Sequence, residues 1–339
     1  MKEKVLFGTY TSQKSNGIYS GVLNTDTKQV SDIAELVQVD NPTYLAVNKS
    51  TLFSVVKQGN QGGVGSFDIS QDQAQLNNVV LAPGAAPCYV SFDSERKLLY
   101  SANYHTADVK VYAVLPDGKL KLTDSFHHTG SGPRPEQTEA HLHYADLTPE
   151  GRLVVVDLGS DELLVFDVDD DGHLNLVQES ILEPGFGPRH IVFSSSNHAY
   201  LVGELSSQVA SLDYDPQTGS FTVKQTLSTI PSDWEGHNGA AAIRLSEDKH
   251  YLYASNRGHD SIAVFKLDAS GRMTHIQTVA TEGKFPRDFA IDPSGSFLLA
   301  AHQNSDTLTL FERDKQSGKL RILWSDVELP QGVCVHFLN

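Results

Sequence analysis

The chain is 339 residues long and carries 42 acidic against 26 basic side chains, a formal net charge of −16 at pH 7. Nucleic acids and anionic membrane surfaces are bound through positive patches, so this charge argues against both as partners. An anionic small molecule would instead need a local cluster of Arg and His. No apolar run approaches the length of a membrane span, and the first residues show no signal-peptide pattern, which predicts a cytoplasmic protein.

The two cysteines, Cys88 and Cys334, each lie inside an apolar strand run. Because two such residues cannot form a disulfide framework, we expect reduced, buried thiols that take no part in catalysis. The sequence has no zinc-finger spacing and no helical His-Glu-x-x-His pattern. It therefore predicts neither a structural metal nor a cofactor.

Taken in order from the N-terminus, nearly every segment is a short run with strand propensity that ends at Gly, Asn, Asp or Pro. The first runs are 5–10 and 17–23. A unit then recurs: an apolar strand led by a small residue or proline, a polar turn, two further strands, and an Asp-x-x-Gly-x-Leu hairpin into a fourth strand. The first strands of these units are residues 42–47, 87–92, 140–145, 188–193, 239–243, 286–291 and 330–335.

The lead residues of these units are spaced by between 44 and 53 positions. A period near that length with four strands per unit is typical of a β-propeller. The last unit has one strand, whereas the N-terminal segment supplies three strands with no first strand of their own. We therefore predict an all-β, seven-bladed β-propeller that forms one domain over residues 1–339, with a ring closed by strands from both termini.

Polar residues interrupt the apolar strands at equivalent positions of the units. In a propeller the first strand of each blade lines the central channel, and the second strand runs back toward the same mouth. The residues that follow the lead positions are Thr43, Cys88, His141, Arg189, Ala240, Arg287 and Gln331. The second strands end at Thr9, Asn103, Asp157, Glu204, Asn256 and His302, followed by Tyr10, Tyr104, Leu158, Leu205, Arg257 and Gln303. Both sets are expected to meet at one mouth of the channel.

Glu204 is the strongest single candidate in this polar funnel, because a carboxylate after an apolar strand is costly unless it is paired or hydrated. Arg189 and Arg287 either bind a ligand or pair with Asp288 or Glu204 merely to stabilise a polar channel. His141 and His143 share one face of a strand, an arrangement that would also suit a metal.

Other polar residues favour structural roles. Asp157 and Asp161 are typical of a turn. His237 lies in a loop that contains Pro and Gly, where it could equally contact a ligand as part of a lid or brace the loop. The pair His127 and His128 is expected at the surface of an outer strand. The acidic hairpin 167–174 resembles part of a calcium loop but lacks the downstream Glu, which favours a solvated turn.

The motifs of this chain resemble those of the seven-bladed propeller lactonases, the propeller-type 6-phosphogluconolactonases, which are related to carboxymuconate cycloisomerases. The resemblance covers essentially the whole chain and is carried by Gly8-Thr9-Tyr10-Thr11, Ala102-Asn103-Tyr104, His141-Leu142-His143, Asp157-Leu158-Gly159-Ser160-Asp161, Gly187-Pro188-Arg189-His190, Glu204-Leu205-Ser206-Ser207, Tyr253-Ala254-Ser255-Asn256-Arg257-Gly258 and Phe285-Pro286-Arg287-Asp288-Phe289. The unit that begins at Pro42 departs from the pattern, with Val56-Lys57-Gln58 where relatives often carry an acid.

The resemblance implies hydrolysis of 6-phosphoglucono-1,5-lactone, with His141, Arg189, Glu204 and Arg257 as the active-site set. On this hypothesis Glu204 or His141 takes a proton from water, and Arg189 stabilises the oxyanion. Arg257, with Arg287 or His190, would hold the phosphate. The residues expected to contact the rest of the sugar are Asn103, His143, His237, Gln303 and Tyr10.

No metal is needed for this reaction, because a δ-lactone is already a reactive ester. Two other functions stay open on the sequence: a muconate-type cycloisomerase that uses the same funnel, and a non-catalytic propeller that serves as a protein-binding platform. The sequence does not define the oligomeric state.

Overall fold

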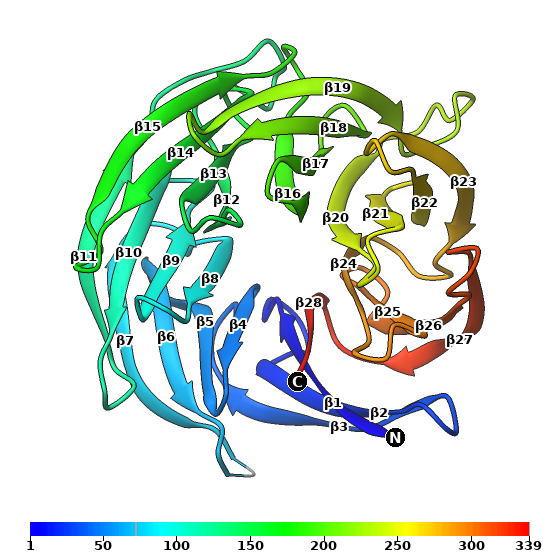
Figure 1. The fold of residues 1–339 in the computed structure, drawn as a ribbon. Coiled ribbons are helices and arrows are strands. Elements are labelled where there is room, and N and C mark those ends of the chain that lie inside the picture. Colours follow the sequence, from blue (N-terminus) through cyan, green and yellow to red (C-terminus); the bar gives the residue numbers. More distant parts are fainter. Residues whose placement is uncertain (72, 339) are drawn as a thin grey trace.

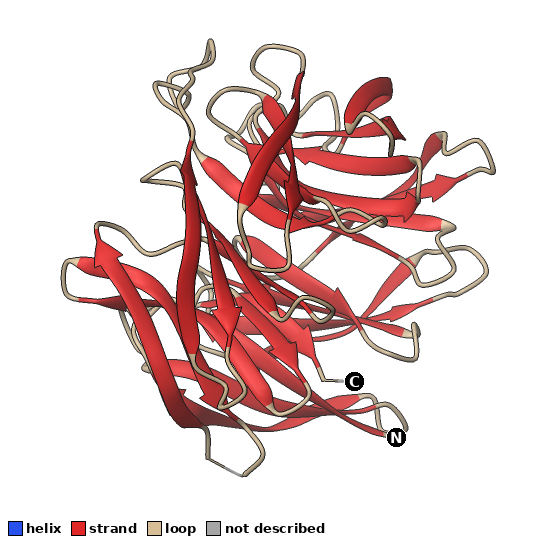
Figure 2. Cartoon of the chain, turned by 60° about the vertical axis from the view of Figure 1, so that its left-hand side comes forward, coloured by secondary structure: helices blue, strands red, loops and turns tan. Residues whose placement is uncertain are grey.

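A computed structural model describes residues 1–71 and 73–338 of the chain. Its described part holds 28 strands in seven four-stranded antiparallel sheets, arranged as blades around a central axis (Figure 1). The turned view shows strands and loops throughout, with no helix among the described residues (Figure 2). The predicted all-β, seven-bladed propeller is confirmed.

The blades are numbered along the chain, each from its innermost strand outward. Blade 1 is β28 (Gly332–Phe337), β1 (Lys2–Thr9), β2 (Gly17–Asn24) and β3 (Gln29–Gln38). Blade 2 is β4 (Leu45–Asn48), β5 (Thr51–Gln58), β6 (Gln61–Asp68) and β7 (Gln75–Pro83). Blade 3 is β8 (Tyr89–Asp93), β9 (Leu98–Ala102), β10 (Asp108–Val114) and β11 (Leu120–His127). Blade 4 is β12 (Leu142–Leu147), β13 (Leu153–Asp157), β14 (Glu162–Val168) and β15 (Leu174–Ile181).

The remaining blades repeat this order. Blade 5 is β16 (Pro188–Ser195), β17 (His198–Gly203), β18 (Gln208–Asp215) and β19 (Ser220–Ser228). Blade 6 is β20 (Gly239–Leu245), β21 (Tyr251–Arg257), β22 (Ser261–Leu267) and β23 (Met273–Ala280). Blade 7 is β24 (Pro286–Ile291), β25 (Phe297–His302), β26 (Thr307–Arg313) and β27 (Leu320–Glu328).

The position of a strand within its blade explains its composition. The second strand of blade 4, β13, reads Leu-Val-Val-Val-Asp and is buried along its whole length, because neighbouring blades cover both of its faces. The outermost strand β15 is largely exposed or half-buried and carries polar residues. The hairpin between β14 and β15 is the predicted solvated turn, in which the Asp169 carboxylate accepts the main-chain N–H of Asp171 at 3.0 Å and of His173 at 2.8 Å.

The ring is closed by both termini, as predicted. The C-terminal β28 is the innermost strand of blade 1 and pairs antiparallel with β1, with Val5 opposite Phe337 and Phe7 opposite Val335. The two ends of the chain therefore lie in one sheet (Figure 1). Closure removes the open sheet edge that a linear array of blades would expose.

Aromatic side chains from the innermost strands, and from Tyr44 just before β4, pack against one another. The ring of Tyr89 lies 4.2 Å from Tyr44 and 4.5 Å from Tyr144, measured between ring centroids, and His190 packs edge-on against Tyr89 at 5.2 Å. His143 makes a similar contact with His190 at 5.2 Å and also lines the cavity described below. The tyrosine cluster therefore lies next to the polar cavity.

Within residues 1–71 and 73–338, no helix is long and apolar enough to cross a membrane.

Candidate active site

Five of the predicted site residues line one cavity of about 350 Å³: Tyr10, His143, Glu204, Arg257 and Arg287. It is built from the residues that lead into the innermost strands and from those that follow the second strands. Its lining residues are Tyr10, Asn41, Thr43, Lys57, Ala85, Ala86, Pro87, Cys88, Tyr104, His105, His143, Glu204, Arg257 and Arg287.

Glu204 lies in this cavity between two arginines. It directly follows β17, and its main-chain N–H donates to the Gly187 carbonyl at 2.7 Å. One carboxylate oxygen, Oε2, lies 3.0 Å from Arg189 Nε and 2.7 Å from Arg257 Nη2. Burial alone would raise the pKa of Glu204, but the guanidinium groups of Arg257, Arg189 and Arg287 outweigh burial and lower the pKa. The carboxylate is therefore ionised and firmly held.

The strand register corrects one step of the sequence comparison. Gly203 pairs with Gln208 as Asp157 pairs with Glu162 in blade 4. Gly203, not Glu204, is therefore the counterpart of Asp157, and Glu204 lies one position further along. Its counterpart in blade 6 is Arg257, so the carboxylate and its guanidinium partner occupy equivalent positions of adjacent blades.

Arg257 and Arg189 contact the same carboxylate oxygen of Glu204. Arg257 lines the cavity, and its guanidinium also donates to the Gly239 carbonyl at 3.2 Å. Arg189 lies outside the cavity lining and is 4% exposed, with Nη1 donating to the Ala241 carbonyl at 2.8 Å. Burial and the neighbouring arginines lower the pKa of Arg189 to about 9, so it is still a cation at neutral pH. Arg189 therefore forms the ion pair with Glu204 that the sequence allowed as an alternative to ligand binding.

His141 is fixed by main-chain groups. Its Nδ1 lies 2.7 Å from the Tyr104 carbonyl, and its ring stacks on the Tyr104 ring with centroids 4.1 Å apart. A carbonyl only accepts, so Nδ1 carries the proton and the neutral ring keeps its lone pair at Nε2. Nε2 has no hydrogen-bond partner among the described residues. The main-chain N–H of His141 donates to Asp157 Oδ1 at 2.7 Å.

His143 and His190 are neutral histidines. Burial, followed by the charge of Arg189, lowers the pKa of both rings well below the usual value. His143 lines the cavity with a buried Nδ1 that has no hydrogen-bond partner in the described chain. His190 instead packs in the tyrosine cluster and does not line the cavity.

Arg287 and Tyr10 both line the cavity. The Arg287 guanidinium carbon lies 5.7 Å from the centroid of the Tyr10 ring, a cation–π contact. Asp288, the other acid that the sequence allowed as a partner of Arg287, pairs with Arg244 at 2.8 Å. Arg287 is therefore not neutralised by its neighbour.

Four further predicted residues do not line the cavity, and one of them is His141, which stacks on the lining residue Tyr104. Asn103 uses its amide on the main chain, donating to the Ala85 carbonyl at 2.9 Å and accepting the N–H of His105 at 3.0 Å. Gln303 is half-buried, and its Oε1 has no hydrogen-bond partner within the described residues. His237 is exposed. Its neighbour Asn238 braces the loop by donating to Ser207 Oγ at 2.8 Å.

The prediction that His128 lies at the surface is wrong, although His127 is exposed as expected. His128 is 8% exposed, with Nδ1 at 2.7 Å from Asp157 Oδ2 and Nε2 at 3.3 Å from Glu162 Oε2. Burial follows because the side chain turns inward just after β11 to meet two carboxylates of blade 4. Asp157 has the predicted turn role, since its Oδ1 accepts the main-chain N–H of Gly159 at 2.7 Å, whereas the Asp161 carboxylate holds the loop before β16 by accepting the N–H groups of Gly185 and Gly187.

Among the described residues, one group of three could hold a metal, and it consists of His128, Asp157 and Glu162 with ligand atoms within 4.8 Å of one another. The two ring nitrogens of His128 already pair with the carboxylates of Asp157 and Glu162. His141 and His143, the pair that the sequence suggested for a metal, are not part of this group.

Both cysteines are free thiols. Cys334 is buried, as expected, whereas Cys88 is half-buried and lines the cavity. Burial raises the pKa of the Cys88 thiol to about 11, so it is protonated at neutral pH and is a poor nucleophile.

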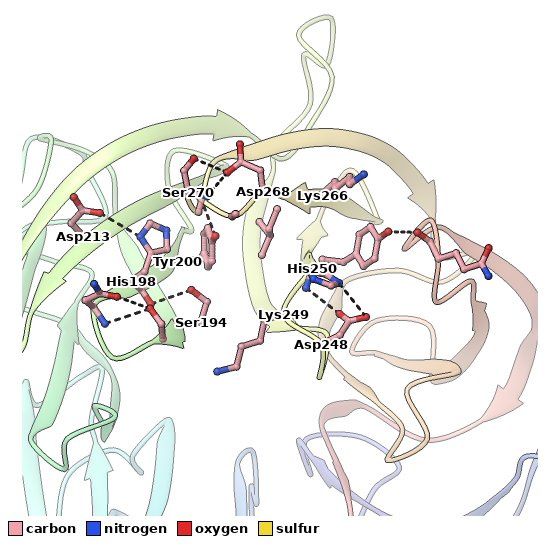
Figure 3. Close-up of a pocket in the computed structure, with 17 residues that line it drawn as sticks. Ser194, His198, Tyr200, Asp213, Asp248, Lys249, His250, Lys266, Asp268 and Ser270 are labelled. Carbon is pink, nitrogen blue, oxygen red and sulfur yellow. Dashed lines mark hydrogen bonds and ion pairs between the residues drawn. The ribbon is translucent and has the colours of Figure 1, made fainter.

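A larger hollow, of about 810 Å³, lies at the other ends of the strands (Figure 3). It is lined by the turns β16–β17, β20–β21 and β22–β23, which lie opposite to the strand ends that carry Glu204 and Arg257. Its two histidines each lie near an aspartate, His198 at 3.4 Å from Asp213 and His250 at 3.8 Å from Asp248. It contains none of the predicted site residues.

The fold and the cavity together place the chain among β-propeller proteins that carry a polar site at one mouth of the central channel. The sequence profile of the family described as "Lactonase, 7-bladed beta-propeller" matches residues 4–337. The chain belongs to this lactonase family and is a hydrolase of carboxylic esters of the lactone type.

Individual relatives agree with this assignment. A protein of Bacillus subtilis (strain 168) named 6-phosphogluconolactonase is 42% identical, over 98% of this chain and 97% of the relative. A crystal structure of a protein from Lactobacillus plantarum has a TM-score of 0.99 at 51% identity, covering 100% of both chains. The Pseudomonas aeruginosa periplasmic gluconolactonase PpgL has a TM-score of 0.93 at 31% identity, covering 100% of this chain and 99% of its own.

Proposed function

We propose that this protein hydrolyses 6-phosphoglucono-1,5-lactone to 6-phosphogluconate. The observation that carries the proposal is the concentration of Arg257 and Arg287 around one cavity of a protein whose net charge is −16. With Arg189 adjoining it, the cavity holds more positive charge than Glu204 can balance, which suits an anionic lactone. The family assignment favours lactone hydrolysis over the cycloisomerase and the binding platform.

The reaction needs a base that takes a proton from water as the water attacks the lactone carbonyl. Glu204 is a weak base because its two arginine partners stabilise the ionised form. His141 has its proton on Nδ1 and a lone pair on Nε2. We assign the base to His141, which can then return the proton to the ring oxygen as the C–O bond breaks.

The attack leaves negative charge on the carbonyl oxygen, which a fixed cation can stabilise. Arg257 lines the cavity and is held by Glu204 and by the Gly239 carbonyl, so its orientation is set before the substrate binds. We assign the oxyanion to Arg257. Arg189, which the sequence suggested for this step, is given a positioning role behind Glu204.

The remaining groups would bind the rest of the substrate. Arg287 holds the phosphate, and His143 and Tyr10 contact the sugar hydroxyls.

The test is the rate of hydrolysis of 6-phosphoglucono-1,5-lactone above its spontaneous rate, with and without a chelator. The native rate is expected to be unaffected by the chelator, and His141→Asn is expected to lower kcat by about a hundredfold or more. His250→Asn, in the opposite hollow of Figure 3, is the matched control and should leave the rate unchanged. A native chain that gives no acceleration would refute the proposal, and full activity of His141→Asn would refute the assignment of the base.

A further inference from the structure

Lys57 lines the cavity but belongs to none of the roles assigned so far. It lies near the end of β5 in blade 2, at the position where the sequence departs from the family pattern. Its side chain is exposed, and its main-chain N–H donates to the Asp40 carbonyl at 3.0 Å. The strand thus anchors Lys57 at the mouth and leaves the ammonium group available.

The order of the blades divides the cavity into two sectors. Arg287 comes from blade 7, Tyr10 follows β1 of blade 1, and Lys57 comes from blade 2, so these residues occupy three consecutive blades. Glu204 and Arg257 come from blades 5 and 6. The ring therefore places Lys57 and Glu204 on different sides of the cavity.

The two sectors also differ in charge. Glu204 is paired with two arginines, whereas neither Lys57 nor Arg287 has a carboxylate within ion-pair distance among the described residues. Asp288 pairs with Arg244, whereas Asp40 accepts the hydroxyl of Thr11 and keeps its charge without forming an ion pair with Lys57 or Arg287. Two cations without an ion-pair partner among the described residues therefore face one end of the cavity.

We propose that Lys57 and Arg287, with Tyr10 between them, form a subsite for the phosphate dianion, and that Lys57 makes the enzyme prefer phosphorylated to neutral sugar lactones. Arg287 offers a planar fork that matches two phosphate oxygens, while Lys57 acts as a point charge. The Tyr10 ring supports the Arg287 guanidinium in place. This inference rests on the proposed function, since it assigns one end of the same substrate.

The test compares kcat/KM for 6-phosphoglucono-1,5-lactone with kcat/KM for glucono-1,5-lactone. In Lys57→Gln the ratio of the two is expected to fall by about tenfold or more, mainly through KM for the phosphorylated substrate. Lys57→Arg, which keeps the charge, should retain most of the ratio. Lys249→Gln, which removes an exposed lysine from the opposite hollow, is the control.

Binding of inorganic phosphate, followed by calorimetry, is a readout independent of catalysis and should weaken in Lys57→Gln and in Arg287→Gln. The double variant should lose less than the product of the two single losses, because both cations contact one phosphate. Suppose that the native enzyme hydrolyses the phosphorylated lactone, and that Lys57→Gln keeps both the native ratio of kcat/KM values and the native phosphate affinity. The proposed subsite would then be wrong, while the proposed function would stand. If the native chain accelerates neither lactone, the proposed function is wrong, and phosphate binding then decides the subsite by itself.

Discussion

Glu204 shows how one side chain can organise a site without carrying out its chemistry. A buried carboxylate is costly in isolation, but here Arg189 and Arg257 lie against the same oxygen. The arrangement keeps three side chains from two blades in fixed positions. The same arginines lower the pKa of Glu204 and make it a weaker base, so we assign proton transfer to His141 instead.

Removing Arg189 should separate positioning from catalysis. Arg189→Met leaves Glu204 with Arg257 and deprives the Ala241 carbonyl of its donor, so we expect a loss of about 1–3 kcal/mol in the free energy of unfolding. We also expect a lower kcat with a smaller change in KM, because the oxyanion group shifts while the phosphate end is untouched. Urea denaturation and steady-state kinetics test this, with Arg189→Lys as the conservative variant. A changed KM with native kcat would contradict the positioning role.

His128 is expected to make stability depend on pH. Its hydrogen bond to Asp157, and the nearby charges of Asp157 and Glu162, raise its pKa above 6.5 in spite of burial. A raised pKa means that the folded state binds the proton more tightly than the unfolded state, so this stabilisation is complete below pH 6.5 and is lost as pH rises through the folded-state pKa.

We therefore expect His128→Gln to destabilise the protein more at about pH 5.5 than at about pH 9. Denaturant unfolding at both values measures the difference, and the exposed neighbour His127→Gln is the matched control. Equal losses at the two pH values would show that the imidazole contributes only as a neutral hydrogen-bonding group.

At the scale of elements, the turn before β16 and the end of β17 set the position of Glu204. Gly187 has a positive φ of 60°, and a Cβ at this position would lie 2.4 Å from Leu205 Cγ. Its carbonyl accepts the Glu204 main-chain N–H at 2.7 Å. The backbone that holds the carboxylate therefore requires glycine at this point.

Gly187→Ala is expected to cost about 1–3 kcal/mol of stability, from the strained φ and the contact with Leu205, and to lower kcat because Glu204 shifts. The midpoint of urea unfolding and the rate of lactone hydrolysis test the two effects. Gly118→Ala is a control with a similar φ of +79° in an outer hairpin, where a loss of stability should leave kcat unchanged. Native activity in Gly187→Ala would mean that this turn does not position the carboxylate.

The whole ring depends on the pairing of β28 with β1. A chain that stops at Gln331 lacks β28, so β1 loses its inner partner and the buried side chains of Val5 and Phe7 lose their cover. We expect such a chain to lose cooperative unfolding and to aggregate through the open edge.

A circular permutant provides the control. Joining the termini, which lie in one sheet, and opening the chain between the exposed residues Asp170 and Asp171 keeps every strand pair of the ring, so this variant should fold. Thermal unfolding and size-exclusion chromatography distinguish the two chains. A well-folded truncated chain would contradict the role of the closure.

Much of this molecule can be derived from its sequence because its architecture repeats. The period of the first strands and the apolar runs between polar turns predict the blades, and incomplete units at both ends predict the closure. The motifs also single out Glu204, Arg189, Arg257 and Arg287, since charged residues at the ends of apolar strands are conspicuous in a local pattern.

The tertiary structure decided which of these side chains share the cavity. Alignment of the repeats matched Glu204 with Asp157, whereas the counterpart of Asp157 is Gly203. The alignment was off by one residue because strand register depends on pairing across the sheet and not on spacing along the chain. His128 was misjudged and Lys57 was left without a role for a related reason: burial and pairing come from neighbouring blades, whose residues lie far away in sequence. A one-dimensional pattern determines periodic elements, whereas contacts between elements follow only from the closed ring.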